Sequence, residues 1–214
     1  MTGQELLDYL RTDILKDAAE PYRWSDALIL RMLSEAESRF ARATYALLDS
    51  ATITTEIGEP EYALPVGTIF VASAAVSTNS RDMENYTRRF IPTNLTTATG
   101  EPSMFICDER SGYIRVYPVP EAVITINLRV ARLPTDVLAT YSTPEIPEEY
   151  HLDLAEYAAY RLLLSNDVDG QNVGASARHE ADWYKRLSDA KREYFRIRSG
   201  ANPRAVRSWT FQRN

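Results

Sequence analysis

The chain has 214 residues, 44% of them hydrophobic and 25% charged, and its formal net charge is −6 at pH 7. This is the composition of an ordinary globular protein, and the negative charge argues against a protein that coats nucleic acid. Its single cysteine, Cys107, excludes an internal disulfide bond. Neither a signal peptide nor a membrane span is expected, because the N-terminus is amphipathic and the longest apolar run contains Pro and Gly.

The charge is unevenly distributed along the chain. Residues 185–214 contain nine Lys and Arg against two acids, a side-chain charge of +7, which leaves −13 for residues 1–184. An acidic body with a basic end often uses that end to dock on an acidic partner.

Proline marks the expected domain boundaries. Nine of the eleven prolines lie between Pro60 and Pro147, whereas residues 22–59 and 148–202 contain none. Proline is costly inside helices and is tolerated at turns and strand edges. We therefore expect a helical domain from residues 1–50 and 145–198, an inserted β domain at 51–144, and a C-terminal tail at 199–214.

Two amphipathic helices are predicted before residue 50. Thr2 and Glu5 have the spacing of a capping box, and the helix that they start should end before Pro21. The second helix should begin at the N-cap Ser25 and continue through ARATYALL. Its apolar residues recur at alternating steps of four and three, which is typical of a helix packed against other helices. They are Ile29, Leu33, Ala36, Phe40, Ala43 and Leu47.

From about Ile53 to Ala131 the apolar period changes to two, which predicts five to seven short strands in a small sandwich or open barrel. MFICD and YIRVYP, separated by ERSG, are predicted to form a hairpin. A second hairpin is predicted from YIRVYP to VITINLRVA, with Pro118 and Pro120 at its turn. GEPEYALP is predicted to supply turn residues.

Two further helices are predicted after the linker STPEIP. The first, near 150–164, is so apolar that it is either central in its own domain or buried against another subunit. The second should run from about 174 to 197. One stripe of the first helix is a candidate subunit interface: Tyr150, Leu154, Tyr157 and Arg161.

Together these elements predict an α+β fold. We expect a four-helix bundle with a small antiparallel β-sandwich or barrel inserted between helices 2 and 3, and an extended C-terminal tail.

No catalytic site, cofactor site or metal site is predicted. His151 and His179, on separate helices, are interpreted as surface or capping residues, and Glu149, Asp153 and Glu156 as a solvated face. The sequence contains no nucleophile elbow, phosphate-binding loop or zinc-ligand spacing. We therefore do not expect an enzyme.

The C-terminal tail combines basic and aromatic residues without an acid. Trp and Phe beside Arg are the residue types enriched at the centres of interfaces, whereas disordered segments contain few large aromatics. Binding to a protein partner is favoured, and single-stranded nucleic acid stacked on the aromatics is the alternative. The candidate binding residues are Arg198, Arg204, Arg207, Trp209, Phe211 and Arg213.

Four stretches in this order carry a family resemblance: RWSDALILRMLSEAESRF, EYALPVG, YIRVYPVPEAVITINLRVARLP and IPEEYHLDLAEYAAYRLLLSNDVD. Over about residues 5–195 the chain resembles the head-to-tail adaptor proteins of tailed double-stranded-DNA phages, also called connector, gatekeeper or tail-tubular proteins. The resemblance implies a homo-oligomeric ring, commonly of about twelve copies, beneath the portal protein at the capsid vertex. It also implies that the C-terminal extension anchors each copy on the portal.

The function expected from the resemblance is that of a virion structural protein. It would be made in the host cytoplasm, join capsid to phage tail, contact the downstream tail (nozzle) protein, and line a channel through which double-stranded DNA passes without specific binding. The alternative is a nucleic-acid-binding or DNA-packaging accessory protein that uses the basic, aromatic tail.

Overall fold

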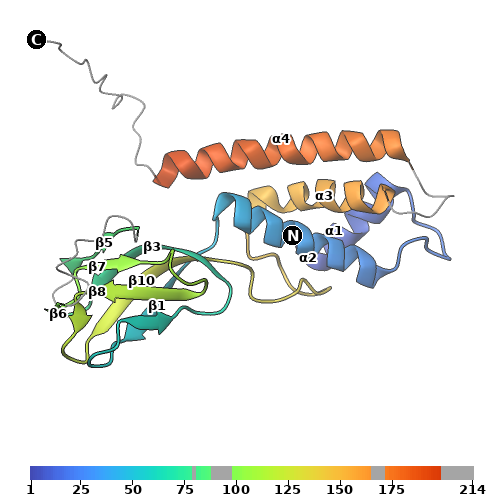
Figure 1. Ribbon diagram of the computed structural model, residues 1–214. Coiled ribbons are helices and arrows are strands. Elements are labelled where there is room, and N and C mark those ends of the chain that lie inside the picture. The colour runs from blue at the N-terminus through green and yellow to red at the C-terminus, as the bar shows by residue number, and fades with distance from the viewer. Residues whose placement is uncertain (79–80, 88–97, 165–171, 199–214) are drawn as a thin grey trace, which may run out of the picture. The chain divides into compact units, whose positions relative to one another are not determined.

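The computed structural model describes residues 1–78, 81–87, 98–164 and 172–198, and the protein has the expected α+β class (Figure 1). Its residues group into two compact units. The helical unit comprises residues 1–44 and the chain from residue 138 onward; the β unit comprises residues 45–137. The division of the chain into 1–50 with 145–198, 51–144 and 199–214 as separate domains stays a prediction.

The helical unit begins with α1 (Gly3–Tyr9) and continues directly into a π-helical segment, η1 (Leu10–Leu15). The predicted capping box is present: the Thr2 N–H donates to Glu5 Oε2 at 2.8 Å, and the Glu5 N–H donates to Thr2 Oγ1 at 3.3 Å. The helical conformation ends at Lys16, whose φ of 54° lies in the left-handed region.

A buried arginine holds the loop between η1 and α2 (Asp26–Thr44). Arg11 is 6% exposed and donates to the carboxylates of Asp17 at 3.0 Å and Asp26 at 2.5 Å, and to the carbonyl oxygen of Trp24 at 2.6 Å. A charged side chain inside a protein needs such partners. The conformation of this loop therefore depends on the Arg11 guanidinium, which bonds to three residues along it.

The helix α2 is shorter than predicted. It starts beside the predicted N-cap, since the Leu28 N–H donates to Ser25 Oγ at 3.3 Å. It stops at Thr44 because Tyr45 has a φ of 55°, which breaks the helical hydrogen-bonding pattern, so Leu47 lies beyond the helix. The predicted apolar face is otherwise confirmed, with Ile29, Leu33 and Phe40 fully buried.

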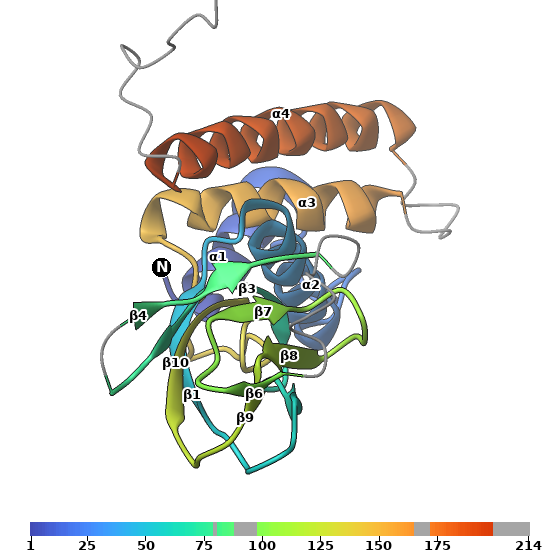
Figure 2. The same ribbon diagram turned by 60° about the vertical axis from the view of Figure 1, so that its left-hand side comes forward.

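The C-terminal part of the helical unit contains a 3-10 turn, η4 (Glu148–Tyr150), then α3 (His151–Leu163) and α4 (Val173–Arg198). α3 packs against both α2 and α4, and Figures 1 and 2 show α4 alongside α3. Among the described residues, no helix is long and apolar enough to cross a membrane.

The return segment from the β unit is tied to α1 and α2. The N–H groups of Gly3 and Gln4 donate to the carbonyl oxygens of Ser142 and Thr140, both at 2.8 Å. A Cβ on Gly3 would lie 2.2 Å from the carbonyl oxygen of Ala139, so only glycine allows this approach.

Within the described residues 45–78, 81–87 and 98–137, the β unit contains two four-stranded sheets and one two-stranded sheet, with ten strands where five to seven were expected. The first has the order β1-β10-β3-β4, the second β2-β8-β7-β5, and the third pairs β6 with β9. The strands are β1 (Leu48–Thr54), β2 (Glu61–Ala63), β3 (Thr68–Val76), β4 (Arg81–Asp82), β5 (Glu84–Asn85), β6 (Thr99–Gly100), β7 (Met104–Ile106), β8 (Tyr113–Tyr117), β9 (Val119–Pro120) and β10 (Thr125–Arg132).

One predicted hairpin is confirmed and the other is wrong. β7 and β8 pair antiparallel, with Phe105 opposite Val116. β8 and β10 do not pair, because β10 lies between β1 and β3 in the other sheet. The segment with Pro118 and Pro120 therefore crosses between sheets, and Val119–Pro120 pairs there with Thr99–Gly100. The segment predicted to be turn, GEPEYALP, contains β2.

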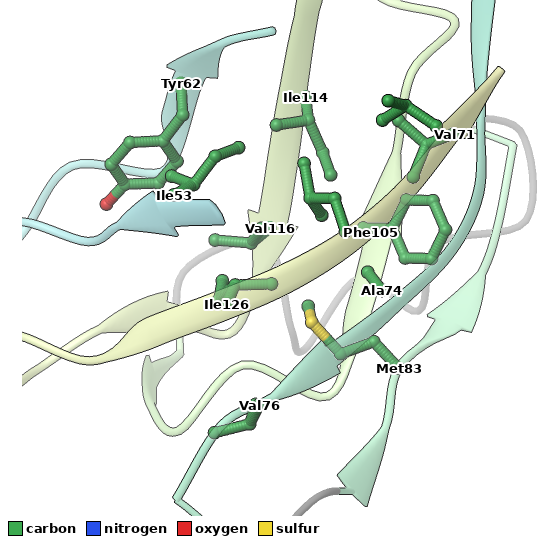
Figure 3. Close-up of a cluster of buried hydrophobic side chains, with 12 residues drawn as sticks. Ile53, Tyr62, Val71, Ala74, Val76, Met83, Phe105, Ile114, Val116 and Ile126 are labelled. Atoms are coloured by element: carbon green, nitrogen blue, oxygen red, sulfur yellow. The ribbon is translucent and has the colours of Figure 1, made fainter. Parts of the chain in front are cut away.

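The two four-stranded sheets share one apolar core. Figure 3 shows Phe105, Ile114 and Val116 from the second sheet together with Val71 and Ile126 from the first. The predicted alternation along β10 is confirmed by the buried residues Ile126, Leu128 and Val130 between exposed Asn127 and Arg129.

Candidate interaction surfaces

The predicted partner-binding tail lies almost entirely outside the described residues. Arg204, Arg207, Trp209, Phe211 and Arg213 belong to the segment after α4, and the Arg198 side chain at the end of α4 is likewise not described. Their role stays a prediction.

The apolar stripe of α3 lies mainly inside the helical unit. Leu154 is 0% exposed, Tyr157 2% and Tyr150 9%. These three side chains fill the space between α2, α3 and α4, so the helix is central in its own unit, the first of the two alternatives for it. Of the four predicted interface residues, only Arg161 is exposed in the isolated chain, and the role of these residues in a subunit interface stays a prediction.

Aromatic rings join the three helices. The ring centroid of Phe40 in α2 lies 4.9 Å from that of Tyr150, and the centroid of Tyr157 lies 5.3 Å from that of Trp183 in α4. The Tyr157 hydroxyl donates to Glu35 at 2.5 Å, and this bond lowers the pKa of the Glu35 carboxyl. Burial raises the pKa of the Tyr157 hydroxyl. The cluster is a satisfied structural core.

A charged network fixes α4 on α3. Arg186 donates to Asp153 at 2.6 Å and lies 3.6 Å from Glu156, while His179 Nδ1 lies 2.7 Å from the other oxygen of Glu156. Burial raises the pKa of the Asp153 carboxyl, and Arg186 opposes that shift. The network therefore resists separation of the two helices.

Two expectations about these residues are wrong. His151 is 2% exposed and not a surface residue; its Nε2 lies 2.9 Å from the carbonyl oxygen of Ile146. Asp153 is 8% exposed and Glu156 is half-buried, so neither belongs to a solvated face. The sequence contained a signal for this packing. His179 and Arg186 are seven residues apart, so they lie on the same side of α4 as Trp183. That side faces the carboxylates of Asp153 and Glu156 in α3.

The ionisable side chains described here have structural roles. Within the described ranges, no group of three His, Cys, Asp or Glu side chains could hold a metal ion. Burial raises the pKa of the Cys107 thiol to about 11, so the thiol stays protonated and poorly nucleophilic at neutral pH. The buried ionisable side chains described above each have a structural partner.

Comparisons with known proteins are consistent with a structural role. No curated protein matches the sequence. The family model described as SU10 adaptor protein matches residues 1–208, nearly the whole chain. This is a family of phage structural adaptors located in the virion, and it is not a known class of enzymes. The match confirms the resemblance to phage head-to-tail adaptors, and the chain belongs to the SU10 adaptor protein family.

Proposed function

We propose that this protein is the head-to-tail adaptor that forms a homo-oligomeric ring of about twelve copies beneath the portal protein. The ring joins the capsid to the phage tail, contacts the downstream nozzle protein, and lines the channel through which DNA leaves the head. The observation that carries this proposal is the family match over residues 1–208.

The proposed architecture is a helical bundle that carries an inserted β-sandwich. The bundle, formed by the helical unit, would be the rigid part of each copy, since α3 is fixed to α2 by the Tyr157–Glu35 hydrogen bond and to α4 by a charged network. The sandwich, formed by the β unit, would be a lateral module. Its shared apolar core allows it to keep its shape while it contacts a neighbour.

The proposed portal anchor is the C-terminal tail with the end of α4. Its residues are Arg198, Arg204, Arg207, Trp209, Phe211 and Arg213, and it carries no acid. Arginine and tryptophan are frequent hot spots of interfaces, and a modest contact repeated around a ring gives high avidity.

The charge distribution suits a DNA conduit. Residues 1–184 carry a side-chain charge of −13. Contacts of Lys and Arg with phosphate dominate non-specific DNA affinity, so a body with this charge would release its cargo.

Mixing the protein with its portal tests the proposal. A ring-on-ring particle should be visible by negative-stain electron microscopy, and the two proteins should co-elute in size-exclusion chromatography. Free chain and free portal after mixing would overturn the proposal.

Removal of residues 199–214 tests the anchor. The truncated chain should keep its circular-dichroism spectrum and melting temperature and lose portal attachment. A matched variant of the full chain, Trp209→Ala with Phe211→Ala, should weaken attachment while retaining the charge. Normal attachment of the truncated chain would overturn the role of the tail.

The alternative nucleic-acid-binding function rests on the same basic, aromatic tail. A gel shift with short single-stranded DNA near physiological salt separates the two functions. A shift that requires residues 199–214, together with no portal binding, would favour the alternative.

A further inference from the structure

The helix α4 has two exposed sides of different composition. One is a stripe at steps of four and three, the spacing of a helix that contacts another surface along its length. We call it the α4 stripe. Only one of its seven residues is charged, all seven are exposed, and it extends over roughly 33 Å. Its residues are Val173, Ala177, Ala181, Tyr184, Ser188, Lys191 and Phe195.

The other exposed side of α4 is entirely charged, as expected for a solvated helix face. Its exposed residues are Arg178, Lys185, Asp189, Glu193 and Arg196, and Asp182 among them is half-buried. The α4 stripe departs from this pattern, with Tyr184 56% and Phe195 72% exposed. Exposed aromatics on a face depleted of charge are characteristic of an interface.

A basic edge runs along the α4 stripe. This edge is where the charged side of α4 meets the α4 stripe. It consists of four exposed bases, Arg178, Lys185, Arg192 and Arg196. The segment 173–198 carries seven bases and four acids, whereas residues 1–172 carry 26 acids and 14 bases. The surface that covers the α4 stripe should therefore be apolar at its centre and acidic around it.

One end of the β unit has that composition. We call it the acidic tip: the loops 55–59 and 121–123. Ile57 is 69% and Val123 64% exposed, and the exposed carboxylates of Glu56, Glu59 and Glu121 flank them. No Lys or Arg occurs in residues 54–62 or 118–124.

The acidic tip is held in shape by hydrogen bonds between its two loops. The Gly58 N–H donates to the carbonyl oxygen of Pro120 at 2.9 Å, and Thr55 Oγ1 donates to that of Ala122 at 3.0 Å. A preformed surface loses little conformational entropy on binding.

A hollow of about 250 Å³ adjoins the acidic tip, and its lining includes Glu101, Glu121, Ala122 and Ile124. A cavity of about 150 Å³ is enough to bind benzene. The hollow can therefore receive one aromatic side chain, and the exposed carboxylate of Glu121 can pair with a cation beside that ring.

We propose that the α4 stripe of one copy docks on the acidic tip of a neighbouring copy, with Tyr184 or Phe195 entering the hollow. This inference rests on the proposed ring. A closed ring of identical chains needs two different, complementary surfaces on each copy, and these two match in charge and apolar content. Pairing of α4 stripes with one another would oppose two basic edges.

Photo-cross-linking in the full chain tests the contact. A benzoylphenylalanine at position 184 should, in rings assembled on the portal, give a covalent dimer of the chain, with the attachment site inside 55–59 or 121–123. The matched control carries the same group at Tyr141, an exposed tyrosine of the helical unit, 93% exposed, and should give no such product.

Charge reversal gives a second readout. Lys185→Glu with Arg192→Glu should lower the yield of rings about tenfold, and adding Glu59→Lys with Glu121→Lys should restore it. All four side chains are exposed, so the melting temperature of each variant should stay near that of the parent.

The outcomes separate this contact from the proposed function. Rings that form normally without a cross-link into the acidic tip overturn the contact and leave the function intact. Attachment to the portal, to another part of the chain, or within one chain also overturns it. If chain and portal form no ring at all, the proposed function fails, and the contact fails with it.

Discussion

The helical unit and the β unit are stabilised in different ways. Among the described residues, the helical unit buries several polar or charged side chains, whereas the β unit buries one, Thr55. Those of the helical unit are Arg11, Glu37, Thr44, His151, Asp153 and Ser176. The core of the β unit is otherwise apolar.

The difference follows from how each unit satisfies its backbone. Strand pairing satisfies N–H and C=O groups inside the sheets of the β unit, so the core between the sheets is built from apolar side chains. In the helical unit, the loop 16–25 and the return segment 138–147 have no strand partner. Side chains hold them: the buried Arg11 binds the first, while the half-buried Ser34 and the buried Glu37 accept the N–H groups of Leu138 and Glu145 in the second.

Separating the two units should have the largest effect on the protein. We expect a fragment of residues 45–137 to fold alone, because its apolar core is internal to those residues. Its circular-dichroism spectrum should be β-rich, with one cooperative thermal transition. An unfolded fragment would show that the β unit depends on the helices, against the predicted domain division.

Within the β unit, loss of apolar volume should have the largest effect of any point substitution considered. Phe105 is 1% exposed at the centre of the shared core (Figure 3). Phe105→Ala should lower the free energy of unfolding by about 3–5 kcal/mol, measured by urea denaturation. Val66→Ala, at a fully exposed position in the same unit, is the control and should change it by less than about 0.5 kcal/mol.

The sequence predicts the periodic elements well and the pairing of strands poorly. The capping box at Thr2 and the buried face of α2 follow from local spacing, which the structure preserves. The sheet that receives β10 depends on contacts with β1 and β3, which lie 50 or more residues away in the chain. No local signal in the segment around Pro118 distinguishes a hairpin turn from a crossover between sheets.

The candidate surfaces show the same limit. An apolar stripe such as Tyr150, Leu154 and Tyr157 predicts that a face will be covered, and the structure shows that α2 and α4 cover it. Buried polar partners were missed because Asp153 and Arg186 meet only when α3 and α4 pack. Residue types alone indicated a solvated face for Asp153 and Glu156.

In the helical unit, removing one partner of the α3–α4 network should have a smaller effect than Phe105→Ala. Arg186→Gln leaves the largely buried carboxylate of Asp153 without its cation, and should cost about 1–3 kcal/mol. The lower end is favoured because the Arg186 side chain is 47% exposed.

The matched control for that substitution is Arg192→Gln on the same helix. Arg192 pairs with Asp189 on the surface, with side chains 75% and 55% exposed, so its loss should cost less than about 0.5 kcal/mol. Equal effects of the two substitutions would show that burial of Asp153 does not determine the strength of the network.

The smallest expected effect is a dependence on pH that has opposite signs at two glutamates of α2. Burial raises the pKa of the Glu37 carboxyl, and the backbone N–H of Glu145 partly offsets this. The stabilisation that comes from the protonated Glu37 carboxyl is complete below about pH 4.3, the pKa of a glutamate in the unfolded chain. It is lost as the pH rises through the higher pKa of Glu37 in the folded protein. Glu37→Gln, which stays neutral, should therefore gain stability relative to wild type between pH 4 and 7.

Glu35 is the control for that sign, since the hydroxyl of Tyr157 lowers its pKa. The ionised Glu35 carboxylate contributes its full stabilisation above the pKa of a glutamate in the unfolded chain, and this is lost as the pH falls through the lower pKa of Glu35 in the folded protein. Glu35→Gln should therefore lose stability relative to wild type as the pH rises from about 3 to 5. Urea unfolding across this range measures both differences. If both variants shift in the same direction, burial of Glu37 does not outweigh its backbone hydrogen bonds. The buried carboxylate would then stabilise the return segment as an anion, and the helical unit would tolerate this buried charge as it tolerates the buried guanidinium of Arg11.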